Sequence, residues 1–66
     1  MKILIIEDDV GIRILQQEIF EDIGYEVILA GDGKEGVESI NQENPDFMIL
    51  DYSLPDMDGY EFIQNL

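Results

Sequence analysis

Residues 3–9 read I-L-I-I-E-D-D, a short apolar run that ends abruptly in three acids. An apolar run of this length with no polar alternation, in which three of four residues are β-branched, is typical of a strand buried on both faces, as in parallel sheets. Two similar runs follow, E-V-I-L-A at residues 26–30 and F-M-I-L at residues 47–50, the latter ending in Asp51. The three runs predict three strands of an α/β fold.

Between the runs, the apolar spacing changes to that of a helix. The first predicted helix has one apolar face, formed by Ile12, Leu15, Ile19, Phe20 and Ile23. Gly24 follows it as a C-terminal stop. Asp32 and Glu35 have the D-x-x-E spacing of a capping box and open a second helix, with Val37 and Ile40 inward. Asn44-Pro45 ends that helix, because proline disfavours helical backbone at the residue before it.

A third D-x-x-E pattern, Asp58-Gly59-Tyr60-Glu61, opens a last helix that carries Phe62, Ile63 and Leu66. Strands and helices thus alternate with short connections, which predicts a parallel sheet with right-handed crossovers. Ligands bind such sheets beyond the carboxyl ends of the strands. Because the last helix has no cap after Leu66, we expect the pattern to be interrupted there.

The charge balance restricts the classes of partner. The 66 residues include three Lys+Arg and 16 Asp+Glu, a formal charge of -13, which argues against nucleic acid or an anionic membrane surface and favours cations and basic protein patches. The apolar runs are too short for a signal peptide or a membrane span, so we expect a cytoplasmic protein. With no Cys and no His, the chemistry must rely on carboxylates, hydroxyls and backbone groups.

Acidic residues gather where two of the predicted strands end. Glu7 and Asp8 follow the first strand, and Asp51 follows the third. If these strands are parallel neighbours, three carboxylates converge and repel one another, and a divalent cation would relieve that repulsion. Mg²⁺ suits the site because it takes one or two carboxylates and keeps several waters. Asp9 has two open interpretations, as part of this cluster or only as the cap of the following helix.

Several strings match one family. They are K-I-L-I-I-E-D-D at residues 2–9 with Arg13 five residues after Asp8, G-Y-E-V at 24–27, G-D-G-K-E-G at 31–36, and P-D-F-M-I-L-D-Y-S-L-P-D-M-D-G at 45–59. The last is the most specific, with a strand-terminal Asp, a Pro four residues later and M-D-G opening the next helix. The chain resembles the N-terminal half of a two-component response-regulator receiver domain. The resemblance implies a flavodoxin-like (CheY-like) α/β parallel sheet of order 2-1-3, truncated to about three βα units over residues 1–66.

The resemblance also implies a function and a set of site residues. Asp51 would be the phosphoacceptor, taking a phosphoryl group from the phosphohistidine of a sensor histidine kinase or phosphotransfer protein. The metal would be Mg²⁺, bound by Asp8, Asp51 and the main-chain carbonyl of Ser53, with Glu7 acting through water. Such a module assists its own phosphorylation but is not an enzyme in the ordinary sense. The chemistry is reasonable because phosphoryl transfer depends mainly on positioning and charge neutralisation.

The chain also departs from the family pattern. A complete receiver has two further βα units, which supply a Ser or Thr and a Lys to the phosphoryl group, and Lys2 and Lys34 lie at the wrong places to replace them. The alternative is therefore a half-receiver that is not phosphorylated and acts as a self-associating or protein-binding module. In either case we expect a homo-oligomer or a need for the missing C-terminal half, because the third strand would be an apolar edge.

The sequence excludes three other types of site. An EF-hand loop starting at Asp51 needs Gly at its sixth position, which is Asp56. A phosphatase of the haloacid-dehalogenase type needs D-x-D, where this chain has Asp51-Tyr52-Ser53. A dinucleotide fold needs a glycine-rich turn after the first strand, where this chain has three acids.

Overall fold

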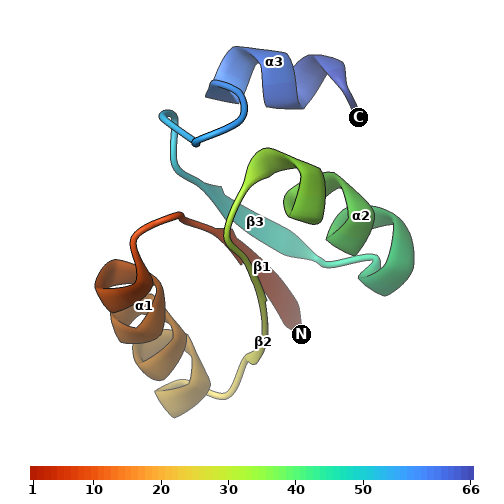
Figure 1. Cartoon of the computed structure of the whole chain (residues 1–66). Coiled ribbons are helices and arrows are strands. Elements are labelled where there is room, and N and C mark those ends of the chain that lie inside the picture. The colour runs from red at the N-terminus through yellow and green to blue at the C-terminus, as the bar shows by residue number, and fades with distance from the viewer.

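The computed structural model describes all 66 residues and confirms the alternation of strands and helices. The elements are β1 (Lys2–Ile6), α1 (Val10–Asp22), β2 (Glu26–Ala30), α2 (Gly33–Glu43), β3 (Phe47–Leu50) and α3 (Gly59–Gln64) (Figure 1). The strands form one parallel sheet of order β2-β1-β3, as predicted. In the register of this sheet, Ile3 of β1 lies opposite Val27 of β2 and Phe47 of β3.

The helix starts follow the predicted capping chemistry in one case fully and in the other by half. Asp58 and Glu61 form a complete capping box. The Asp32 side chain accepts a hydrogen bond from the Glu35 N–H (2.8 Å), but the Glu35 side chain accepts no return bond from the Asp32 N–H, so the box predicted there is only half formed. Gly24, just past α1, has a positive φ of 96°, and Asn44 ends α2 with a left-handed φ of 49°. These local bonds satisfy the free N–H and C=O groups at helix ends and so fix the element boundaries.

The core lies mainly on one side of the sheet. In Figure 1, α1 covers one side, and α2 and α3 lie on the other. The central strand β1 is buried from Ile3 to Ile6. The buried core cluster combines residues of all three strand-to-helix units: Leu4, Ile6, Ala30, Leu54 and Phe62. Helix α2 approaches β1 closely at Gly36, where an added Cβ would lie only 2.7 Å from Ile6 Cδ1 and 2.9 Å from Phe62 Cε1.

The predicted apolar face of α1 is largely exposed. No residue of α1 is buried, and Ile12, Leu15, Ile19 and Ile23 are each about half exposed or more. The helix itself lies where the spacing predicted it. It packs mainly on β2 and β1, and no other helix lies on its side of the sheet (Figure 1). The spacing did not indicate what covers the apolar face, and in this structure most of that face is open to solvent.

Aromatic and charged contacts gather at the amino ends of the strands. Tyr25 stacks between Phe20 and Phe47, with ring centroids 5.7 Å and 6.2 Å away. At the same end, Lys2 Nζ lies 3.5 Å from the carboxylate of Glu43 and 3.8 Å from that of Glu26. These are the only ion pairs in the structure. No helix is both long enough and apolar enough to pass through a lipid bilayer.

Candidate functional site

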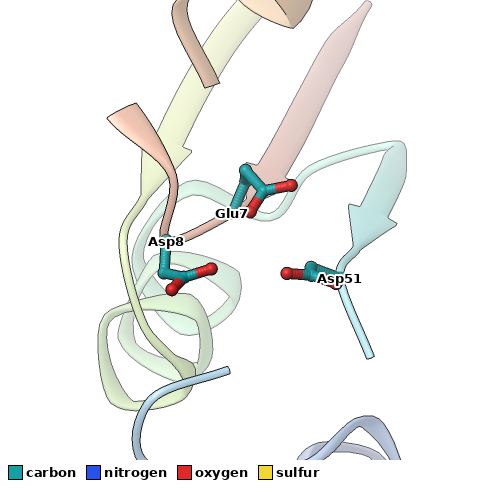
Figure 2. A group of neighbouring side chains, drawn as sticks. All are labelled: Glu7, Asp8 and Asp51. Atoms are coloured by element: carbon teal, nitrogen blue, oxygen red, sulfur yellow. The ribbon is translucent and has the colours of Figure 1, made fainter. Parts of the chain in front are cut away.

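Three carboxylates meet beyond the carboxyl ends of β1 and β3. Glu7 and Asp8 directly follow β1, and Asp51 directly follows β3. Backbone hydrogen bonds continue past the strand ends, from Asp51 N–H to Ile6 C=O and from Glu7 N–H to Ala30 C=O, both 3.1 Å. One carboxylate oxygen from each of the three acids lies within 4.8 Å of the others. Figure 2 shows the Asp8 and Asp51 side chains pointing toward one another.

The charge of this cluster is not balanced by any cation of the chain. Arg13 donates from its guanidinium to the backbone carbonyl of Glu7 (3.0 Å) and forms no ion pair. Lys2 is engaged at the opposite end of the sheet. Burial raises the pKa of Glu7 above 4.5, and repulsion from Asp51 raises it further, against a bond from the Asp9 N–H that lowers it. Three adjacent negative groups thus remain uncompensated.

Asp9 lies outside the cluster. It is the N-cap of α1, and its side chain accepts a hydrogen bond from the Ile12 N–H at 2.9 Å. The Asp9 N–H in turn donates to the Glu7 carboxylate at 3.2 Å, which orients that side chain. Of the two interpretations left open by the sequence, the structure supports capping, and the register Glu7-Asp8 gives the acidic pair.

The β3–α3 loop, residues 51–58, is folded back on itself. The Tyr52 C=O accepts from the Gly59 N–H (2.8 Å), and the Leu54 N–H donates to the Met57 C=O (3.2 Å). The Ser53 N–H approaches Asp51 Oδ1 at 3.4 Å. Leu54 is buried in the core, so the loop is anchored from within. Ser53 is thus held beside Asp51, while the use of its main-chain carbonyl as a ligand stays a prediction.

One long-range contact near the site was not predicted from the sequence. The Asp56 carboxylate accepts hydrogen bonds from the Gly33 N–H (2.8 Å) and the Lys34 N–H (3.0 Å), at the first turn of α2. These bonds, that from Gly33 first, lower the pKa of Asp56 below 3.8. The available signal was the helix end itself, because the Asp32 cap serves the Glu35 N–H and leaves two N–H groups without an acceptor.

The comparison with protein families agrees with this geometry. The family model of the response regulator receiver domain matches residues 3–66. The chain belongs to this family. Receiver domains are signalling modules of two-component response regulators.

Two curated relatives align with almost the whole chain. Sporulation initiation phosphotransferase F of Bacillus subtilis is 40% identical over 65 residues, covering 98% of this chain and 52% of that protein. The alkaline phosphatase synthesis transcriptional regulatory protein PhoP of the same organism is 42% identical over 98% of this chain and 27% of its own length. The chain thus spans about half of the first relative and about a quarter of the second.

Solved receivers share the fold closely. The chemotaxis response regulator CheY4 of Vibrio cholerae superposes with a TM-score of 0.93 at 34% identity, over 97% of this chain and 53% of that chain. The response regulator TrrA of Thermotoga maritima, solved in complex with Mg(2+)-BeF, gives 0.90 at 33% identity, over 97% and 56%. The CheY-like fold expected from the sequence is therefore confirmed.

Proposed function

We propose that this receiver accepts a phosphoryl group on Asp51 from a phosphohistidine of a sensor histidine kinase or phosphotransfer protein. The observation that carries the proposal is the convergence of Glu7, Asp8 and Asp51 within 4.8 Å at the strand ends, with no cation of the chain paired to them. Family membership supports the same assignment.

The donor set fits Mg²⁺. All the available ligand atoms are oxygens, and their charge is uncompensated. Glu7 and Asp51 are partly buried and Asp8 is exposed, which leaves room for the waters that Mg²⁺ retains. Asp8, Asp51 and the main-chain carbonyl of Ser53 would hold the ion, with Glu7 acting through water. A bound Mg²⁺ would neutralise the negative charge that gathers during phosphoryl transfer. The TrrA complex with Mg(2+)-BeF supports this reading for the same fold.

The residues of the chain itself provide the nucleophile and its position. An oxygen of the Asp51 carboxylate forms a bond to phosphorus as the N–P bond of the phosphohistidine breaks, and the electron pair of that bond stays on the imidazole nitrogen. The backbone bond to Ile6 fixes Asp51 at the end of β3. Since the Ser53 N–H faces Oδ1, the other carboxylate oxygen is free to attack. Positioning of this kind is the main contribution a protein makes to phosphoryl transfer.

Labelling with a small phosphodonor tests the proposal. The chain is incubated with acetyl phosphate and Mg²⁺, and any adduct is mapped by mass spectrometry. One phosphoryl group should be found on Asp51. It should form slowly, because the chain has no Lys side chain at the site to contact the phosphoryl group. Asp51→Asn abolishes the adduct, whereas Asp9→Asn, a matched change two residues from Glu7, leaves it in place. A label on another residue, or one that persists in Asp51→Asn, would refute the assignment.

The partner side of the proposal rests on charge. With a formal charge of -13, the chain favours a basic docking surface on its kinase or phosphotransfer partner. Association should therefore slow as ionic strength rises. The cytoplasmic location expected from the sequence stays a prediction.

The exposed apolar surface supports a second candidate, a self-associating or protein-binding module. β3 lies at the edge of the sheet, Phe47 is 48% exposed, and the apolar face of α1 is open. An open strand edge offers unpaired N–H and C=O groups to a second copy. Sedimentation at several micromolar concentrations separates the candidates: a dimer that Phe47→Lys dissociates would support self-association, and a monomer throughout would exclude it.

A further inference from the structure

Asp56 joins two parts of the receiver that are distant in sequence. It lies in the β3–α3 loop, three residues after Ser53, and its two carboxylate oxygens accept from the N–H groups of Gly33 and Lys34 at 2.8 Å and 3.0 Å. Because the Asp32 side chain caps the Glu35 N–H, the three N–H groups at the start of α2 are then all satisfied. A carboxylate at this end also interacts favourably with the helix dipole.

The neighbouring residue strengthens the same junction. Gly33 is buried, and an added Cβ there would lie 2.5–2.8 Å from Cγ, Sδ and Cε of Met57. The Met57 side chain therefore packs directly on the first residue of α2, which only glycine leaves open. The loop is fixed to α2 by a two-bond polar contact and by an apolar contact at adjacent residues. We call this junction, formed by Asp56 and Met57 against Gly33 and Lys34, the α2 clip.

We infer that Asp56 is a positioning residue of the receiver site, holding the β3–α3 loop so that Ser53 and Asp51 keep the geometry needed to bind the cation. The inference rests on the proposed function, since it concerns the same site. The loop begins at Asp51, which is bonded to β1, and ends at the α3 cap Asp58, so both ends are fixed by other contacts. Between these ends the loop is held from within by Leu54, and the α2 clip adds a second attachment at Asp56 and Met57 that limits the motion of the Ser53 carbonyl.

Mg²⁺ titration of the full chain, followed by amide NMR shifts at residues 7, 8, 51 and 53, tests the role of Asp56. Asp56→Ala removes both acceptors and should weaken Mg²⁺ binding by up to about tenfold, the lower end of the loss caused by removing a hydrogen-bond partner of a ligand, because Asp56 acts on Ser53 only through the loop. Asp56→Asn removes the same charge but keeps one acceptor oxygen, so its affinity should be intermediate. Asp32→Ala, which uncaps the same helix without touching the loop, should bind Mg²⁺ as the unmodified chain does.

The controls separate positioning from charge and from stability. All titrations are made at a temperature where each variant is folded by circular dichroism, so loss of fold does not enter the comparison. Equal affinities for Asp56→Asn and Asp56→Ala would mean that only the charge matters and would overturn the inference. Unchanged affinity in Asp56→Ala would overturn it too, while leaving the proposed function standing. If the unmodified chain shows no Mg²⁺ shifts at residues 8 and 51, both proposals fail together.

Discussion

Replacing Asp51 with Asn should stabilise the chain in the absence of Mg²⁺. The substitution keeps the shape of the side chain and an oxygen for the Ser53 N–H, but removes one of three charges that lie within 4.8 Å of one another. At that distance each pair of charges repels by about 0.9 kcal/mol in bulk water and about 3.5 kcal/mol at an effective dielectric constant of 20. The acids are exposed or half-exposed, so values near the lower limit apply. Removing two such pairs should raise the free energy of unfolding by about 1–2 kcal/mol.

Mg²⁺ should reverse the order of stability. An ion that binds only the folded chain stabilises it by about 2.7 kcal/mol at a concentration 100 times its dissociation constant. The unmodified chain should gain this amount, whereas Asp51→Asn loses a direct ligand and should gain much less. The variant is therefore the more stable of the two in EDTA and the less stable in saturating Mg²⁺.

Urea unfolding followed by far-UV circular dichroism measures both effects, at one fixed protein concentration and near pH 7.5. Glu38→Gln is the matched control, because it removes one negative charge from an exposed site on α2, outside the cluster. It should respond to Mg²⁺ as the unmodified chain does. If Asp51→Asn is less stable than the unmodified chain in EDTA, the three carboxylates are not in repulsive contact. If its stability rises in Mg²⁺ as much as that of the unmodified chain, Asp51 is not a ligand.

Three further predictions follow from single residues. Burial raises the pKa of Glu7 above 4.5, so between the two pKa values the folded chain keeps a proton that the unfolded chain has lost. The free energy of unfolding in EDTA should therefore fall as pH rises from about 4.5 through the folded pKa. Glu7→Gln should reduce this pH dependence in urea unfolding, and an unchanged dependence would exclude Glu7 as its source. Phe62→Ala, at a fully buried site, should lower the free energy of unfolding by about 3–5 kcal/mol in the same assay. The control Ile63→Ala, at a 54% exposed site, should lower it by about 0.5 kcal/mol or less. Similar losses for the two variants would place Phe62 outside the core. Gly24→Ala should lower the thermal midpoint by the equivalent of about 1 kcal/mol, because φ is 96° there although no atom lies within 4 Å of an added Cβ; an unchanged midpoint would show that this backbone is relaxed.

Local signals were enough to predict the elements and the acidic site. The apolar run before Glu7 and the run before Asp51 each define a strand and the place where it ends. Parallel pairing then brings the two strand ends together, with no further information needed. A helix cap such as Asp58 bonds to a residue three positions later in the chain, so caps too can be predicted from the sequence.

Contacts that depend on the packed arrangement could not be predicted. Asp56 is one acid among 16, and its partner N–H groups lie 22–23 residues earlier in the chain, so nothing local distinguishes it. Leu15 shows a second limit of the sequence pattern. Its helical spacing correctly gives an apolar face, but periodicity does not say which element covers that face, and here the side chain is 57% exposed.

The placement of the aromatic rings gives the molecule a built-in optical label. There is no Trp, so ultraviolet emission comes from three tyrosines. Tyr25 is stacked between two phenylalanines at the amino ends of the strands, far from the acids, whereas Tyr52 is 65% exposed and adjoins Asp51 in the chain. Occupancy of the site should change the emission of Tyr52 and leave that of Tyr25 constant. A Tyr52→Phe variant then isolates the reporter signal, and site occupancy can be followed in solution without attaching a dye.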